Sequence, residues 1–270
     1  MTRTSLFLGI ATMAVVASTS AAVAQSPSRA QQRAPQTTSK GMAAVQHAAA
    51  ADKYLFVFLW KETGSQTDSM WKVFQPAMSK LADRAESVAV NVSDPAEKPL
   101  VDKFGIDRSP LPLVLALAPN GAITKGFPGK LTEAQLSQAF VSPGTAGCLK
   151  ALQSRKLVLL CVQSRSPQTQ QVSLQQGVAD FVADARYASA TEIVAIDPAD
   201  PAEASFLKDL QVDLRTAGDT TVFLAPPGSV VGKFDGAVTK EQLVAKLQTA
   251  QSDPCAGGKC GPGGCKPRKR

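Results

Sequence analysis

The most concentrated reactive chemistry of this 270-residue chain is a row of three cysteines near its C-terminal end, Cys255, Cys260 and Cys265. The spacers between them are rich in glycine, and the second also holds a proline, so no helix or strand is expected to fix the thiols. Any interaction that fixes these thiols must offset the conformational entropy that the tail loses on ordering. Disulfides or several metal–thiolate bonds can do so. The sequence leaves three alternatives open: disulfides, including one to a partner chain, a soft metal ion such as Cu(I), or no defined role.

A closed zinc site is disfavoured in this tail, because no histidine lies nearby and the cysteine spacing is C-x4-C instead of C-x2-C. The basic segment 266–270 follows Cys265 directly and is expected to lower the pKa of its thiol. Cys265 is therefore predicted to be the most reactive thiol of the mature chain.

The two remaining cysteines stand in apolar surroundings. Cys161 lies inside the continuous apolar run 157–162, typical of a buried strand, and is predicted to be a small buried side chain. Cys148 lies in a segment expected to be helical. A helix packed on that strand would bring the two thiols together, so a Cys148–Cys161 disulfide is the alternative.

The remaining composition excludes several classes of protein. A single histidine, His47, leaves little room for histidine-based catalysis or histidine-rich metal sites. The formal net charge is +7, but the tail 251–270 carries five basic residues and one acidic residue. The body is thus nearly balanced in charge, and no nucleic-acid partner is expected.

The first residues have the pattern of a secretory signal peptide, with Arg3, an apolar stretch over 6–17 and Ala22-Val23-Ala24 before the expected cleavage site. Residues 1–24 are therefore predicted to be removed on export to the periplasm or the cell exterior, where disulfides persist. No further apolar run reaches about 18 residues, so no membrane-spanning helix is expected. Residues 25–41 are predicted to form a flexible leader.

An internal repeat relates two halves of the chain. The apolar run 53–59 corresponds to 156–162, and Asp-Pro-Ala-Glu at 94–97 recurs at 200–203. Both halves end in a Thr-x-x-Gln pattern typical of a capping box, at Thr132/Gln135 and Thr239/Gln242. Each half is expected to contain helices and short strands in the same order, giving an α/β fold with a mixed β-sheet flanked by helices on both faces. The predicted domains are 42–142 and 145–250, followed by the Gly/Cys-rich basic tail 251–270.

This order of elements resembles the thioredoxin fold. Phe58-Leu59-Trp60 is similar to the strand end that leads into the redox loop of that family, and the segment 74–82, with Pro76, is similar to its kinked second helix. Leu111-Pro112 before an apolar strand is similar to its cis-proline loop. The resemblance implies two tandem thioredoxin-like domains.

The activity of thioredoxins depends on a Cys-x-x-Cys at the start of the helix after the first buried strand. Counting back from Pro76 places 68–71 on these positions, with Asp68 as the helix cap, whereas counting forward from Trp60 places 64–67 there. Neither stretch contains cysteine, and neither does the corresponding loop 164–168 of the second half. We therefore predict no catalytic residues and no thiol–disulfide exchange at this site in either domain.

Four residues around that loop are the candidate partner-binding surface: Trp60, Asp68, Trp71 and Pro112. Simple packing is the alternative role for the two tryptophans. Asp219 replaces the proline in the second half, so only the first keeps the substrate-facing loop. The predicted function is a binding or scaffolding role in the cell envelope, with a protein or peptide partner and no cofactor in either domain. The alternative is thiol-redox or soft-metal handling through the tail.

Overall fold

The structure is a computed structural model that describes residues 39–163, 175–212 and 219–252. The predicted signal peptide, the leader up to residue 38 and the loop 164–168 lie outside these ranges. So does the tail from residue 253, with Cys255, Cys260 and Cys265. Within the described ranges, no helix has both the length and the apolar character needed to cross a membrane.

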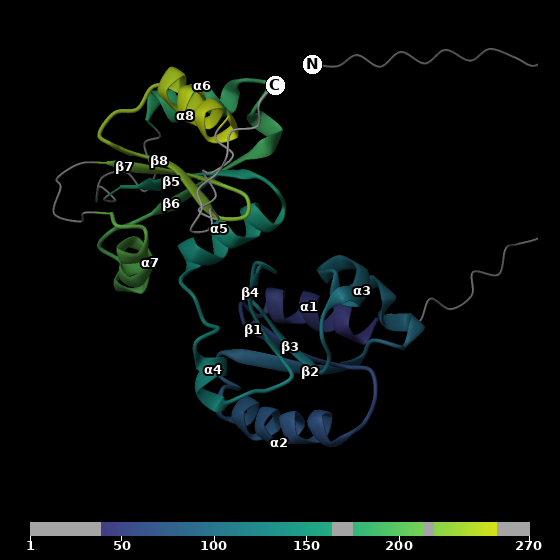
Figure 1. Cartoon of the computed structure of the whole chain (residues 1–270). Helices are drawn as coiled ribbons and strands as arrows, with labels where there is room; N and C mark the ends of the chain where they lie inside the picture. Colours follow the sequence, from purple (N-terminus) through teal and green to yellow (C-terminus); the bar gives the residue numbers. More distant parts are fainter. Residues whose placement is uncertain (1–38, 164–174, 213–218, 253–270) are drawn as a thin grey trace, which may run out of the picture. The chain divides into compact units, whose positions relative to one another are not determined.

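Domain 1 designates the part of the chain from α1 to α4. Its elements are, in order, α1 (Lys40–Ala50), β1 (Tyr54–Trp60), α2 (Ser65–Lys80), β2 (Ala85–Asn91), η1 (Pro95–Glu97), α3 (Lys98–Phe104), η2 (Ile106–Arg108), β3 (Leu113–Leu117), β4 (Ile123–Pro128) and α4 (Glu133–Ser137). The strand order is β2-β1-β3-β4, with β1 parallel to β2 and antiparallel to β3, and with β3 antiparallel to β4. α1 and α3 cover one face of this sheet and α2 and α4 the other (Figure 1).

Domain 2 repeats the arrangement. It contains α5 (Pro143–Gln153), β5 (Leu157–Val162), α6 (Gln176–Ala183), η3 (Ala188–Ala190), β6 (Thr191–Ile196), η4 (Pro201–Glu203), α7 (Ala204–Asp209), β7 (Thr220–Ala225), β8 (Ser229–Asp235) and α8 (Lys240–Ser252). The strand order β6-β5-β7-β8 and the strand directions match those of domain 1. The α/β fold expected from the sequence is confirmed: each of the two domains has a mixed four-stranded sheet with helices on both faces, the arrangement that the resemblance to the thioredoxin fold implies.

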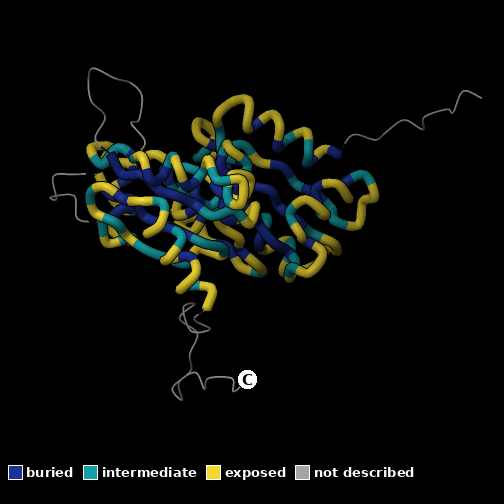
Figure 2. Tube along the Cα trace, turned by 90° about the horizontal axis from the view of Figure 1, so that it is seen from above, coloured by how far each residue is buried: buried dark blue, intermediate teal, exposed yellow. Residues whose placement is uncertain are grey.

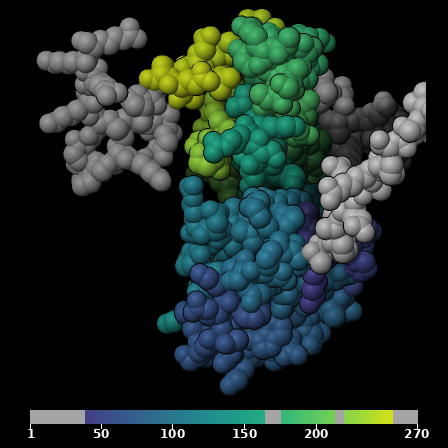
Figure 3. Space-filling view, turned by 90° about the vertical axis from the view of Figure 1, so that its right-hand side faces the viewer, coloured from purple at the N-terminus to yellow at the C-terminus, as the bar shows by residue number. Residues whose placement is uncertain are grey.

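The central strand of each sheet is buried on both faces, which is why its sequence is a continuous apolar run. In domain 1, Phe58 packs against Phe74 of α2, whereas the adjacent Leu59 points to the opposite face and packs with Leu100 of α3. In Figure 2 the stretches of the trace that run through the interior are dark blue, the colour of buried residues. Each fully buried side chain of this size contributes about 1.5–3 kcal/mol. In the space-filling view the described elements of each domain pack closely on the face displayed (Figure 3).

Local signals in the sequence were accurate. Both predicted capping boxes are present: Thr132 and Gln135 exchange the two bonds at the start of α4, and Thr239 and Gln242 do so before α8. The Leu111–Pro112 peptide is cis, as expected. The structure also has a cis bond at Pro226–Pro227, which was not expected from the sequence.

The repeated Asp-Pro-Ala-Glu motif fixes the first helix of each domain. Glu97 is 5% exposed and accepts hydrogen bonds from Ser39 Oγ (2.6 Å) and from the backbone N–H of Gly41 (3.0 Å), at the N-terminus of α1. A Cβ at Gly41 would lie 2.8 Å from Glu97 Oε2, so only glycine admits this approach. The motif therefore joins segments far apart in the sequence.

Domain 2 contains the same anchor. Glu203 is 4% exposed and accepts bonds from Ser142 Oγ (2.5 Å) and from the backbone N–H of Gly144 (2.7 Å), at the start of α5. From the sequence, Asp-Pro-Ala-Glu is recognised only as a mark of the internal repeat. The Ser-x-Gly pattern at 39–41 and at 142–144 is the signal that could have revealed its partner.

Candidate functional site

The start of α2 decides between the two alignments of the redox loop. Gly64 is the N-cap, and the helix begins at Ser65. This helix start favours the alignment in which 64–67 corresponds to the redox positions that the resemblance to thioredoxins implies. The prediction that Asp68 caps the helix is wrong: Asp68 lies within the first turn, and its backbone N–H bonds to the carbonyl of Gly64. The physical reason is that α2 extends further ahead of Pro76 than the alignment from that proline assumed.

One pocket lies between this helix start and the cis-proline. We call it the proline pocket; it encloses about 390 Å³ and is lined by Lys61, Glu62, Gly64, Ser65, Gln66, Thr67, Leu111 and Pro112. Gln66 Nε2 donates to the carbonyl of Gly129 across its edge (3.3 Å). The pocket therefore offers the side-chain amide of Gln66 and the hydroxyls of Ser65 and Thr67 beside the buried Pro112.

A second pocket lies beside the same helix start. We call it the tryptophan pocket; it encloses about 260 Å³ and is lined by Phe58, Trp60, Thr63, Thr67, Asp68, Trp71 and Ala89. Trp71 is half-buried and held by two aromatic neighbours, edge-on to Phe58 with ring centroids 5.0 Å apart and tilted against Phe74 at 5.6 Å. Trp60 is half-buried at the end of β1. Both tryptophans thus pack against the core and also line a pocket.

The structure brings together three of the four predicted surface residues, Trp60, Asp68 and Trp71, in the tryptophan pocket, and places Pro112 in the proline pocket. Thr67 lines both pockets, so the two pockets lie next to each other. Its hydroxyl donates to the carbonyl of Glu62 (3.0 Å), which ties the helix start to the loop. Sequence reasoning missed Thr67; its position at the helix start, in the second alignment, was the signal.

The two described cysteines do not form the disulfide considered above. Both are free thiols in the structure. Cys148 on α5 packs in the cluster that contains Val158 and Leu160 of β5, whereas Cys161 packs with Phe181 of α6 on the opposite face of the sheet. Side chains alternate between the two faces along a strand. The thiol of Cys148, on the helix that covers the face opposite to Cys161, therefore cannot reach it.

The chemistry of these thiols is suppressed by burial. Burial and, to a lesser extent, the nearby carboxylate of Glu203 raise the pKa of the Cys148 thiol to about 12. Burial and then the charge of Asp219 raise the pKa of the Cys161 thiol to about 11. The thiolate is the nucleophile in exchange reactions, so neither group is prepared for them near neutral pH.

The corresponding site of domain 2 has a different character. Gln163 stands where domain 1 has Trp60, and its side-chain amide donates to Asp219, the counterpart of Pro112 (3.3 Å). Cys161 replaces Phe58. The aromatic lining is therefore confined to domain 1 among the residues that the structure describes at these positions.

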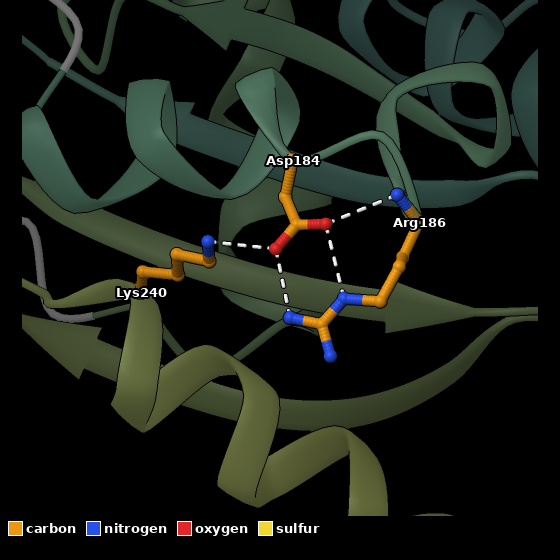
Figure 4. A network of polar contacts seen from close by, with 3 residues as sticks. All are labelled: Asp184, Arg186 and Lys240. Carbon is orange, nitrogen blue, oxygen red and sulfur yellow. Dashed lines mark hydrogen bonds and ion pairs between the residues drawn. The ribbon is translucent and has the colours of Figure 1, made fainter.

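A cluster of charged side chains ties two helices of domain 2 together. Asp184, at the end of α6, accepts from the backbone N–H and guanidinium of Arg186 and from Lys240 Nζ at the start of α8 (2.7 Å; Figure 4). These bonds, the guanidinium of Arg186 first, hold the pKa of the Asp184 carboxyl well below its ordinary value. Across the described ranges, no group of three or more His, Cys, Asp or Glu side chains is placed to hold a metal ion.

Comparison with solved structures gives likenesses of low sequence identity. The germline-specific thioredoxin Deadhead from Drosophila melanogaster is 17% identical, with a TM-score of 0.30 over 37% of this chain and 90% of its own. A disulphide isomerase from Xylella fastidiosa is 14% identical, with a TM-score of 0.31 over 43% of this chain and 95% of its own. The zinc-bound form of human ERp44 is 12% identical, with a TM-score of 0.35 over 83% of this chain and 60% of its own. No protein-family model and no curated protein matches the sequence.

Proposed function

We propose that this chain is an exported, non-catalytic binding protein of the cell envelope, and that domain 1 holds a segment of a protein or peptide partner. The observation that carries the proposal is the pair of pockets that meet at Thr67. They surround a helix start that has the thioredoxin position but no thiol.

The character of the two pockets favours a polypeptide ligand. Volumes of about 390 and 260 Å³ suit one or two side chains each, and the shared Thr67 lets one chain reach both. Partly exposed tryptophans are enriched at the energetic centres of protein interfaces. The rim supplies donors and acceptors for a backbone, among them the side chains of Gln66 and Thr67.

A catalytic thiol in either domain is disfavoured on physical grounds. The segment 64–67 contains no cysteine. The two thiols that the structure describes are buried, and their pKa values are raised to about 12 and about 11. We therefore expect no insulin reduction attributable to either domain. Activity that survives removal of residues 251–270 would contradict this expectation.

Binding is tested by filling the junction of the pockets. Thr67→Arg places a long side chain where the two pockets meet, and Ser69→Arg adds the same side chain to α2 at an exposed position outside both pockets. On an array of extended peptides, we expect Thr67→Arg to lose binding at least about tenfold, or about 1.4 kcal/mol, and Ser69→Arg to retain it. Equal binding by wild type and Thr67→Arg would refute the site.

The three-cysteine tail supports a second proposal, in which the chain handles thiols or a soft metal ion. It rests on the even spacing of Cys255, Cys260 and Cys265 in the sequence, outside the described residues. The mass of the mature protein with and without reductant, after thiol alkylation and after addition of Cu(I), separates disulfides from a metal site. Three free thiols that take up no Cu(I) would rule out both.

A further inference from the structure

The tryptophan pocket combines aromatic walls with a carboxylate on its rim. Phe58 and Ala89 lie at its base, Trp60 and Trp71 form the indole surfaces, and Thr63, Thr67 and Asp68 bring polar groups. We propose that this pocket receives a positively charged side chain, arginine above all, of the partner segment. This inference rests on the proposed function of domain 1 and specifies the chemistry that it recognises.

The aromatic groups are suited to a cation. An indole face attracts a guanidinium or ammonium group more strongly than any other side-chain ring. The ring of Trp71 is already held by Phe58 and Phe74, and the side chain of Trp60 packs against the same buried cluster. Rings fixed before binding lose little conformational entropy when the ligand arrives.

Asp68 supplies the complementary charge. Its side chain is exposed, and within 39–163, 175–212 and 219–252 no ion pair is formed by this carboxylate, not even with Lys72 one turn along α2. A neutral apolar ligand would remove water from the carboxylate without replacing its hydrogen bonds, which costs free energy. A guanidinium stacks on the indole and donates to the carboxylate, so arginine satisfies both groups.

The size of the pocket and its neighbour favour a side chain over a free small molecule. About 260 Å³ lies below the usual range of small-molecule pockets, which begins near 300 Å³. The proline pocket shares Thr67 with it and lies next to it, so a backbone seated there can place a side chain in the tryptophan pocket. Lys61 and Glu62 on that side carry opposite charges, so the net attraction for a cation comes from Asp68.

The chain provides its own reporter. Its two tryptophans both line this pocket, so the intrinsic tryptophan fluorescence of the full chain responds to what enters it. The probes are blocked tripeptides, Gly-Arg-Gly, Gly-citrulline-Gly and Gly-Leu-Gly, with tetramethylammonium as the free cation. We expect the arginine peptide to bind at least about threefold more tightly than its uncharged citrulline analogue, and added salt to reduce this difference.

Two matched variants isolate the carboxylate. Asp68→Asn is expected to weaken binding of the arginine peptide about three- to fivefold and to leave the citrulline peptide unchanged. Asp83→Asn removes the same charge from an exposed position beyond the other end of α2 and is expected to have no effect. Equal affinities for arginine and citrulline, tighter binding of the leucine peptide, or indifference to Asp68→Asn would overturn the inference. Tetramethylammonium binding as tightly as the arginine peptide would contradict a polypeptide source of the cation.

These outcomes are distinguishable from failure of the proposed function. If the arginine peptide shows no preference while Thr67→Arg still abolishes binding of longer peptides, domain 1 binds polypeptides and the cation inference alone is wrong. If Thr67→Arg changes nothing and no peptide alters the fluorescence, both fail together.

Discussion

Replacement of Glu97 by alanine tests the anchor that holds α1 on domain 1. The carboxylate accepts from Ser39 Oγ at 2.6 Å and from the N–H of Gly41 at 3.0 Å, and it is 5% exposed. A hydrogen bond to a charged group contributes about 1.5–3 kcal/mol, and the change removes both bonds. Ser39 Oγ still accepts a bond from Met42 N, so the lower end of that range applies to each. We therefore expect Glu97→Ala to lower the free energy of unfolding of domain 1 by about 3 kcal/mol.

The assay is urea unfolding followed by two signals. Tryptophan fluorescence reports domain 1 alone, because Trp60 and Trp71 both lie in it, whereas far-ultraviolet circular dichroism reports both domains. With a urea dependence of about 2 kcal/mol per molar, a loss of about 3 kcal/mol lowers the fluorescence midpoint by about 1.5 M. Glu97→Gln keeps the shape of the side chain and one acceptor oxygen, so we expect the free energy of unfolding to fall by about 1 kcal/mol.

Two control variants are compared with Glu97→Ala in the same assay. Glu203→Ala removes the equivalent anchor of domain 2 and is expected to change the dichroism while the fluorescence transition shifts far less. Glu133→Ala breaks an exposed ion pair with Lys80, for which less than about 1 kcal/mol is expected. A Glu97→Ala midpoint indistinguishable from that of Glu133→Ala would show that the buried carboxylate does not anchor the helix.

Three further outcomes are expected. The free energy of unfolding should fall as pH rises from about 9 toward 11–12. The thiols of Cys148 and Cys161 have pKa values raised from 9.0 to about 12 and about 11 in the folded protein, so they ionise at lower pH in the unfolded chain. An equally steep decline in the variant with both Cys148→Ala and Cys161→Ala would contradict this. Asp184→Asn should lower the thermal midpoint at pH 7, and its difference from wild type should shrink below about pH 4, because a depressed carboxyl pKa stabilises only above the unfolded value; a constant difference from pH 7 to pH 2 would refute the charge argument. In alkylation followed by peptide mapping, Cys265 should react fastest and Cys161 slowest, and equal rates in the folded protein would end that hypothesis.

Much of the fold could be predicted from the sequence because its signals are local. The continuous apolar run 157–162 required a strand buried on both faces, and Thr-x-x-Gln marked two helix starts. The repeat then required one architecture for both halves. The lack of cysteine in 64–67 and in 68–71 held for either alignment, so the missing redox pair needed no coordinates.

The site itself depended on tertiary structure. The structure starts α2 at Ser65 and not at Asp68, which favours the alignment of 64–67 over that of 68–71 with the redox loop. The sequence could not decide this, because a proline within a helix does not determine how many residues of the helix precede it. Cys148 and Cys161 are separated because they lie on opposite faces of the sheet. Alternation along the strand places neighbouring side chains on opposite faces, but only the tertiary structure shows which helix covers each face. The bond from Gly41 to Glu97 and the meeting of two pockets at Thr67 join residues from separate elements. Such contacts are decided by how the chain packs in three dimensions, because the spacing of residues along the sequence does not fix which distant segments approach each other.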